Sequence, residues 1–308
     1  MTIPTRILGR TGAKVTVLGY GAMELRGLPR GPEISDADAG KLLNEVLDSG
    51  ITLIDTSIDY GASEELIGTH IGHRRDEYFL ASKCGCLLTP PPGATPPFPH
   101  DYSAANVRAG VEQSLRRLQT DHLDLVQIHM SPSRHQIEHE GTLDELVKLR
   151  DEGKIGFLGM SGILPHLADH IEMGVFDVFQ IPYSVLQPEH GELVTKAAES
   201  GAGVLIRGGV ARGTASEEKN WSVQPLSTTS DTPAADLWEA GKLDELLDEG
   251  QSRHELILRF TLSHPGLSST IVGTSKLDHL LNNVGMASLG PLPEDLYAEA
   301  KRRVGITD

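Results

Sequence analysis

Short apolar segments alternate with amphipathic segments along nearly the whole chain, and this alternation limits the fold more than any other feature. The clearest unit joins a helix predicted over 35–50, with a serine N-cap and a glycine stop, to the β-branched run 51–54. This run is too short for a helix and lacks the apolar–polar alternation of a half-exposed strand, so it predicts a strand buried on both faces. Buried strands separated by helices indicate parallel pairing.

The same unit recurs through the 308 residues. The predicted strands lie at 15–19, 51–54, 79–82, 123–128, 155–160, 177–181, 203–206 and 269–272. The predicted helices lie at 35–50, 62–72, 103–119, 140–152, 164–173, 189–200, 252–263 and 276–287. Eight strand–helix units can close into a (β/α)8 barrel. The alternative is an open doubly wound sheet, but the G-x-G-x-x-G turn of a dinucleotide-binding sheet is missing after the first strand.

Residues 1–14, with Gly9 and Gly12 as turn signals, predict a hairpin at the end of the barrel opposite the ligand-binding face. We therefore expect an α/β fold in which residues 1–308 form one TIM barrel domain, a (β/α)8 barrel with an N-terminal β-hairpin and extra helices.

Composition excludes several classes of protein. Hydrophobic residues make up 39% of the chain and glycine 33 of 308 residues, as in ordinary globular proteins, so disorder is excluded as the main state. We expect a cytoplasmic protein without a membrane segment, because no run of about eighteen apolar residues and no apolar signal core occurs. The formal charge of −16 argues against nucleic acid as a partner and means that an anionic ligand needs a local cationic pocket. The sequence carries no signal for an oligomeric state.

Two groups of residues contain atoms that bind metals elsewhere, and we expect neither group to bind a metal. Cys84 and Cys86 form C-x-C, which has neither the further ligands of a structural zinc site nor the C-x-x-C redox spacing, so they are interpreted as packing thiols. His135 and His139 lie four residues apart without the H-E-x-x-H signature and are interpreted as loop histidines.

Polar side chains follow three successive predicted strands, at the face where barrels bind ligands. Asp55 ends the second strand with Tyr60 just beyond it, Lys83 ends the third, and His129 ends the fourth. A lysine held charged by Asp55 favours the phenolate of Tyr60, so we expect a lowered pKa for Tyr60 and a role as general acid. His129 can then orient a carbonyl oxygen.

These residues stand in motifs that resemble those of the aldo-keto reductase family. Asp55 and Tyr60 stand in D-T-S-I-D-Y-G, similar to the family's D-T-A-x-x-Y-G, Lys83 stands in A-S-K, and His129 stands in Q-I-H. Other similar stretches are S-L-R-R-L at 114–118, G-K-I-G-F-L-G-M-S at 153–161, Gln180, and I-V-G-T-S at 271–275. The resemblance covers nearly the whole chain.

The resemblance implies a reductase that converts an aldehyde or ketone into an alcohol. It implies a nicotinamide cofactor lying extended across the barrel mouth, with neither a Rossmann domain nor a metal. By the same resemblance Tyr60 is the acid, Lys83 and Asp55 tune it, and His129 helps to bind the carbonyl group. NADPH is the expected cofactor, with NADH as the alternative.

The turn before the last predicted helix reads G-T-S-K, and helix N-terminal N–H groups together with Lys276 attract an anion. The resemblance implies that Ser161 and Gln180 hold the carboxamide, but Gly162 stands where the family usually has asparagine. Arg207 stands where many members stack an aromatic ring, and His279 and Asn282 stand where relatives contact the 2′-phosphate and adenine. The expected cofactor-binding residues are Gly21, Ala22, Met23, Asp55, Ser161, Gln180, Arg207, Gly208, Val210, Gly273, Thr274, Ser275, Lys276, His279 and Asn283.

The substrate pocket is expected to include Met23 and Met130, with walls from the loops at 84–102, 130–138 and 208–232. Two other functions are compatible with these residues. One is a nicotinamide-binding regulatory protein, and the other is an aldolase that forms a Schiff base on Lys83. A Schiff-base lysine should be neutral, so pairing with Asp55 would argue against the aldolase.

Overall fold

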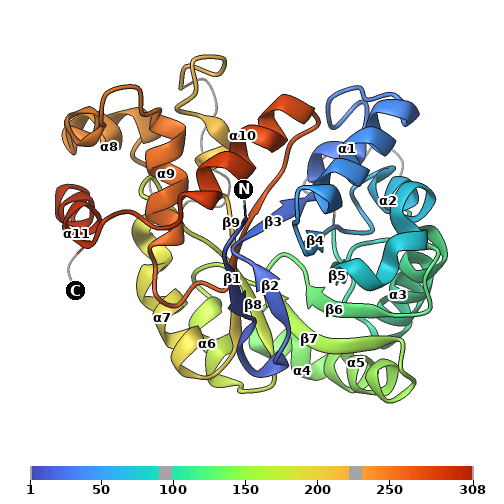
Figure 1. Ribbon diagram of the computed structural model, residues 1–308. Helices are drawn as coiled ribbons and strands as arrows, with labels where there is room; N and C mark the ends of the chain where they lie inside the picture. The colour runs from blue at the N-terminus through green and yellow to red at the C-terminus, as the bar shows by residue number, and fades with distance from the viewer. Residues whose placement is uncertain (1, 90–98, 222–230, 307–308) are drawn as a thin grey trace.

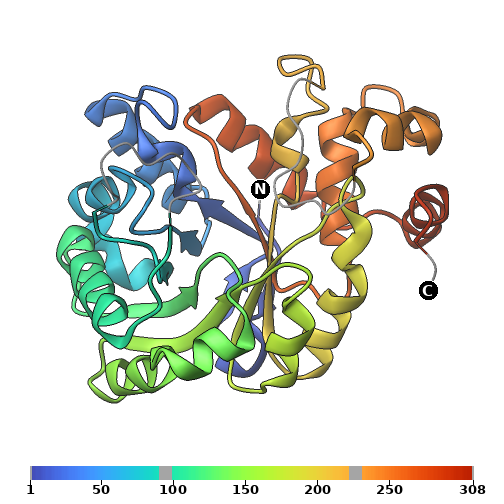
Figure 2. The ribbon, with the colours of Figure 1, turned by 180° about the vertical axis from the view of Figure 1, so that it is seen from behind.

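The computed structural model describes residues 2–89, 99–221 and 231–306. Within them eight parallel strands close into a barrel in the order β10-β3-β4-β5-β6-β7-β8-β9. The helices surround the barrel, as two opposite views show (Figures 1 and 2). The predicted (β/α)8 barrel is confirmed, and the alternative of an open doubly wound sheet is excluded.

The elements follow the predicted order. The hairpin strands are β1 (Thr5–Ile7) and β2 (Lys14–Thr16), and the barrel strands are β3 (Leu18–Gly21), β4 (Leu53–Asp55), β5 (Phe79–Cys84), β6 (Leu123–Ile128), β7 (Ile155–Ser161), β8 (Val178–Pro182), β9 (Gly203–Arg207) and β10 (Ser269–Val272). The helices that follow successive barrel strands are α1 (Asp36–Asp48), α2 (Ser63–Ile71), α3 (Ala104–Leu118), α5 (Thr142–Asp151), α6 (Leu167–Glu172), α7 (Gly191–Glu199), α9 (Arg253–Leu262) and α10 (Leu277–Ser288). Further helices are α4 (Arg134–His139), α8 (Ala234–Ala240) and α11 (Glu294–Arg303).

Serine caps start several of these helices, as predicted for the segment at 35–50. The hydroxyl of Ser35 accepts the N–H of Asp38 at 3.1 Å, and Ser103 and Ser252 cap α3 and α9 in the same way. None of the helices in the described residues combines the length and the apolar composition that a membrane span requires.

The predicted bounds of the first strand, 15–19, were wrong, because two sheets share this stretch. The hairpin strand β2 ends before Val17 and the barrel strand β3 begins at Leu18. The N–H of Val17 donates to the carbonyl of Pro4 at 2.9 Å, while its carbonyl accepts from the N–H of Thr270 at 2.8 Å. Apolar character continues through both halves, so the pattern alone could not reveal that they bond to different partners.

The hairpin covers the end of the barrel where the strands begin, as the sequence predicted. Leu8 and Val15 are fully buried against inward-pointing apolar side chains of the barrel strands. Gly9 fits because it has no side chain: a Cβ there would lie 2.1 Å from the backbone nitrogen of Gly203, at the start of β9. In Figure 1 the hairpin, in dark blue, lies in front of the barrel strands.

The barrel interior changes character along the strands. An apolar layer next to the hairpin consists of Leu53, Ala81, Leu125, Val178, Leu205 and Ile271. Because strand side chains alternate between the two faces, residues two positions further along the same strands also point inward. These residues form a polar layer that consists of Asp55, Lys83, Gln127, Gln180 and Arg207. The polar layer therefore lies at the carboxyl ends of the strands, where barrels bind their ligands.

Candidate active site

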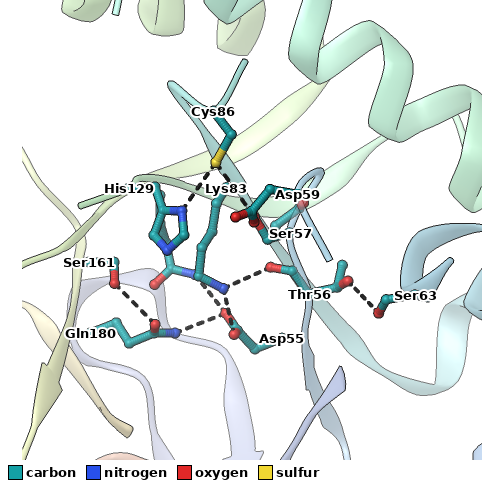
Figure 3. Close-up of polar contacts among 12 residues, drawn as sticks. Asp55, Thr56, Ser57, Asp59, Ser63, Lys83, Cys86, His129, Ser161 and Gln180 are labelled. Carbon is teal, nitrogen blue, oxygen red and sulfur yellow. Dashed lines mark hydrogen bonds and ion pairs between the residues drawn. The ribbon is translucent and has the colours of Figure 1, made fainter. Parts of the chain in front are cut away.

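A buried ion pair lies in the polar layer. Lys83 Nζ is 2.6 Å from Asp55 Oδ2 and donates a second hydrogen bond to the carbonyl of Thr56 at 2.8 Å (Figure 3). Burial disfavours the charged ammonium, but the negative charge and hydrogen bond of Asp55, assisted by the charge of Asp59, outweigh that effect and raise the pKa of Lys83. The ion pair therefore keeps Lys83 charged.

The second carboxylate oxygen of Asp55 is also bonded. Asp55 Oδ1 accepts hydrogen bonds from Gln127 Nε2 at 2.8 Å and from Gln180 Nε2 at 2.9 Å. Ser161 Oγ donates in turn to Gln180 Oε1 at 3.2 Å. All of these side chains are buried, so the network fixes the carboxylate and, through it, the ammonium.

Tyr60 lies in the loop after β4, beside the ion pair. Lys83 Nζ is 5.0 Å from the centre of the Tyr60 ring. Burial raises the pKa of Tyr60, and although Lys83 lowers it as expected, the carboxylates of Asp55 and Asp59 raise it further. The predicted lowering of the Tyr60 pKa was therefore wrong in its net direction, because sequence spacing shows the charges but not the loss of water around the phenol. Tyr60 holds its proton at neutral pH.

His129 follows β6 and faces the same space. Its ring centre is 6.4 Å from that of Tyr60, in an edge-on arrangement, and its Nδ1 is 3.1 Å from Cys86 Sγ. The Tyr102 hydroxyl donates to the His129 carbonyl at 2.7 Å and holds the backbone. Burial lowers the pKa of His129 to about 3 against the opposing effect of Asp59, so the imidazole is neutral at physiological pH.

One cavity of about 1400 Å³ connects this group to the turn after β10. Nearly all of the residues predicted from the sequence line it: Gly21, Met23, Asp55, Tyr60, His129, Met130, Ser161, Gln180, Arg207, Gly208, Val210, Gly273, Thr274, Ser275, Lys276, His279, Asn282 and Asn283. Lys83 and Ala22 do not line it. Lys83 is buried in its pair with Asp55, and Ala22 is fully buried.

The far end of the cavity begins with a tight backbone turn. A Cβ on Gly273 would lie 2.6 Å from the carbonyl oxygen of Gly21, which leaves room only for glycine. Thr274 Oγ1 accepts the N–H of Lys276 at 3.0 Å, just before α10. Asn283, further along α10, is bonded to His254, with Oδ1 and Nε2 2.9 Å apart.

Lys276 already has an anionic partner. Its Nζ is 2.8 Å from Glu218 Oε1, and His279 Nε2 is 3.8 Å from Glu218 Oε2. Glu218 lies in the segment after β9, so this contact joins two walls of the cavity. The positive charge that the sequence assigned to an anionic ligand is therefore shared with a carboxylate of the chain itself.

The sequence departs from the family pattern at Gly162 and Arg207, and the structure shows what surrounds each residue. A Cβ on Gly162 would lie 2.8 Å from Leu167 Cδ1, so the usual asparagine would not fit without a shift of neighbouring side chains. Arg207 lines the cavity at the end of β9, and burial lowers its pKa while Tyr60 and Asp55 oppose that effect. The guanidinium thus lies on the same side of the barrel as the Asp55–Lys83 pair.

Sequence reasoning missed several neighbours of the predicted residues. Gln127 could have been found, because it stands near the end of the predicted strand at 123–128, two positions after the inward-pointing Leu125. Asp59, His100 and Glu218 also line the cavity, but their loops carry no periodic pattern. Of the predicted pocket walls, the parts at 90–98 and 222–230 lie outside the described residues.

Comparisons with known proteins agree with this geometry. The aldo/keto reductase family model matches residues 17–303. L-galactose dehydrogenase of Arabidopsis thaliana is 30% identical over 96% of this chain and 92% of its own length. D-threo-aldose 1-dehydrogenase of a Pseudomonas species is 27% identical over 94% of each chain.

A solved structure shares the whole fold. The holo form of an aldo-keto reductase from Bacillus halodurans superposes with a TM-score of 0.84 at 27% identity, covering 99% of this chain and 98% of that one. With the family match over most of the chain, the predicted resemblance is confirmed. The chain belongs to the aldo/keto reductase family of oxidoreductases.

Proposed function

We propose that the protein is an NADPH-dependent reductase that converts an aldehyde or ketone into the corresponding alcohol. The observation that carries the proposal is the arrangement at one end of the cavity. There the Asp55–Lys83 pair lies beside Tyr60, with Lys83 Nζ 5.0 Å from the ring centre, and the neutral imidazole of His129 faces the same space. Family membership supports the same class of reaction.

The residues along the cavity fit a nicotinamide dinucleotide. The volume of about 1400 Å³ exceeds the roughly 300–1,000 Å³ of most small-ligand pockets. Backbone N–H groups and the ammonium of Lys276 suit phosphate groups at one end, and Ser161 and Gln180 offer polar atoms for the carboxamide at the other. When bound, the reduced nicotinamide supplies a hydride to the carbonyl carbon.

Tyr60 serves as the general acid. Its raised pKa keeps the phenol protonated, so it donates its proton to the carbonyl oxygen while the carbonyl carbon is reduced. The phenolate that forms faces the ammonium of Lys83, whose charge is maintained by Asp55. After the alcohol leaves, Tyr60 regains a proton from water.

His129 orients the carbonyl group. Its Nδ1 contacts Cys86, which leaves Nε2 for the carbonyl oxygen in the cavity. Because burial keeps the ring neutral, His129 acts by hydrogen bonding and not as a competing cationic acid.

Cofactor preference depends on the far end of the cavity. A 2′-phosphate beside Lys276 must displace Glu218, whose carboxylate lies 2.8 Å from the ammonium. We therefore infer a moderate preference for NADPH over NADH, since the gain from the phosphate is reduced by the loss of an existing ion pair.

The Schiff-base alternative is disfavoured by the same ion pair. A lysine that forms a Schiff base must have a neutral amine. Lys83 is buried and paired with Asp55, and its pKa is raised, so its amine stays protonated. A regulatory role would require cofactor binding without turnover, and the intact Asp55, Tyr60, Lys83 and His129 group argues against lost catalysis.

A turnover assay tests the proposal. Purified protein is mixed with NADPH and a panel of aldehydes, ketones and aldoses while the absorbance of the reduced cofactor is followed, with Tyr60→Phe as the matched control. We expect consumption of NADPH with at least one carbonyl class and almost none with the variant. Tight NADPH binding without turnover of any carbonyl would favour the regulatory alternative, and a borohydride-trapped adduct on Lys83 would favour the aldolase.

A further inference from the structure

The polar layer of the barrel carries more positive than negative charge. It contains one carboxylate, on Asp55, and two cations, on Lys83 and Arg207, while Gln127 and Gln180 are uncharged. Asp55 Oδ2 lies 2.6 Å from Lys83 Nζ (Figure 3). Burial lowers the pKa of Arg207, yet a guanidinium stays charged in proteins. The layer as a whole is therefore positive by the charge of Arg207.

Arg207 has a fixed place at the end of β9. The register aligns it with Pro182 of β8 on one side and with Ile271 of β10 on the other. Gly208 then turns the chain with a φ of 71°, and the N–H of Tyr183 donates to the Arg207 carbonyl at 3.4 Å. Since Arg207 also lines the cavity, its guanidinium is presented to that space from a backbone held on both sides.

The guanidinium lies within electrostatic reach of the side chains proposed to hold the carbonyl group. Its charge opposes the raised pKa of Tyr60 and adds to the lowering of the pKa of His129. A carbonyl oxygen bonded to Tyr60 and His129 would therefore lie near Arg207. A group that gives a hydride to the carbonyl carbon must approach it within about 3–3.5 Å, so that group would also lie within reach of the guanidinium.

We propose that Arg207 makes the protein bind NADPH more tightly than NADP⁺. This inference rests on the proposed function, in which the nicotinamide lies beside the carbonyl group. The reduced ring is neutral and the oxidised ring carries a positive charge, so the guanidinium repels the oxidised form alone. The phosphates and the adenine are the same in both forms, and their contacts cancel in the ratio of the two affinities.

A second carboxylate near Tyr60 is matched by another cation. Arg30 Nη2 lies 3.7 Å from Asp59 Oδ2, and Arg30 Nη1 donates to the Asp59 carbonyl at 2.6 Å. Ser57 Oγ donates to Asp59 Oδ1 at 2.6 Å and holds the carboxylate in place. Asp59 thus adds no net negative charge once Arg30 is counted with it, and the charge of Arg207 still acts on the ring.

The preference has a consequence for release of the product. After each reduction the protein holds the oxidised form, which the guanidinium destabilises. NADP⁺ therefore leaves more readily, and NADPH competes for the vacated cavity with the higher affinity. Arg207 acts in this way on cofactor exchange, whereas Lys83 acts on the phenolate of Tyr60.

Binding titrations of the full-length protein test the inference without any turnover. Dissociation constants for NADPH and for NADP⁺ are measured by calorimetry in the absence of a carbonyl compound. We expect NADPH to bind about tenfold more tightly than NADP⁺. Arg207→Gln should bring the two constants within about twofold of each other, mainly by tightening NADP⁺, whereas Arg207→Lys keeps the charge and should keep most of the ratio.

Lys276→Ala is the matched control, because this lysine lies at the far end of the cavity. It should weaken both forms by the same factor and leave their ratio unchanged. Equal affinity of the original protein for the two forms would overturn the inference even if no variant folds, and so would a ratio that Arg207→Gln does not change. Binding of neither form would contradict the proposed function itself, whereas tight and equal binding of both would contradict only the role of Arg207.

Discussion

One lysine–carboxylate pair lies behind the wall of the cavity and a second lies on it, and the two pairs differ in burial far more than in geometry. Lys83 Nζ is 2.6 Å from Asp55, and the two side chains are 1% and 6% exposed. Lys276 Nζ is 2.8 Å from Glu218, but those side chains are 53% and 60% exposed. The nitrogen–oxygen distance is therefore almost the same in the two pairs, although the inner pair is shielded from water and the outer pair is exposed to it.

Burial decides what each pair can do. Removing one partner of the inner pair leaves an uncompensated charge that water cannot reach, so that pair is fixed in the fold. In the outer pair water replaces either partner at little cost, so the pair can open for a ligand. The inner pair is suited to holding a charge constant during a reaction, and the outer pair to exchanging one anion for another.

The largest effect is expected for Lys83→Met. It should reduce kcat by at least about 10³-fold and lower the free energy of unfolding by about 3–5 kcal/mol, because Asp55 is left as a buried unpaired charge. Steady-state kinetics and urea unfolding measure the two effects. Lys276→Met is the matched control and should leave stability unchanged, and Asp55→Asn combined with Lys83→Met should regain part of the lost stability. Equal stability of both single variants would remove the distinction between the pairs.

Tyr60→Phe should act on catalysis alone. We expect kcat to fall by about 10²–10⁴-fold, since the general acid is lost while the ion pair and the fold remain. The dissociation constant for NADPH, measured by fluorescence quenching, should stay within about twofold of the original value, since the deleted hydroxyl contributes to the reacting end and not to cofactor anchoring. Turnover close to normal would contradict the assigned role of Tyr60.

Buried imidazoles should make stability depend on pH. Burial lowers the pKa values of His190 and His264 to about 4 and that of His129 to about 3, from an ordinary 6.5. Because the folded-state pKa values are the lower ones, the unfolded chain binds more protons, and the free energy of unfolding decreases as pH falls below about 6.5 toward 4. The slope should be on the order of 1 kcal/mol per pH unit for each histidine.

The local bonds explain this sensitivity. His264 Nδ1 accepts the N–H of Gly266 at 3.1 Å and His190 Nε2 accepts that of Leu164 at 3.3 Å, and a protonated ring could accept neither. Urea titrations between about pH 7.5 and pH 5 should therefore give a shallower slope for His264→Gln than for the original protein. His139→Gln, at an exposed position on helix α4, should not change the slope. A stability that is constant over this range would contradict the assignment.

The smallest effects concern the outer pair. Lys276→Ala should weaken NADPH binding by about three- to tenfold and leave NADH almost unchanged, while Glu218→Gln should tighten NADPH binding by about two- to fivefold. Both differences should shrink as salt is added. Titrations of each cofactor at low and high ionic strength provide the measurement. Equal weakening of both cofactors by Lys276→Ala would show that this lysine does not distinguish them.

The sequence predicted the architecture and the inner pair well, for physical reasons. Strand–helix alternation is local, and polar residues that end buried strands must converge in a closed barrel, so Asp55, Lys83 and His129 could be grouped from spacing alone. The bounds of β3 could not be found, because Val17 belongs to both sheets by hydrogen bonding and not by side-chain type. Helix α11 was outside the predicted ranges, since among its residues Ala300 is the buried one and its apolar stripe is weak.

Other features depend on distance through space. The contact between Glu218 and Lys276 joins residues 58 positions apart, and the sequence pattern of neither segment predicts contact with the other. The net pKa of Tyr60 depends on how much water the fold removes, which charge patterns do not report.

Closure of the barrel also has a consequence for how the chain is made. The first barrel strand, β3, pairs with the last strand, β10. One edge of β3 therefore stays unpaired until residues 269–272 have been synthesised. Until then a growing chain has exposed strand edges at β3 and at its newest strand, which are sites for pairing with other unfinished chains. Any product that stops before β10 should therefore aggregate and lack the cavity, whereas in the finished chain β10 pairs with both β3 and β9 and leaves neither edge free.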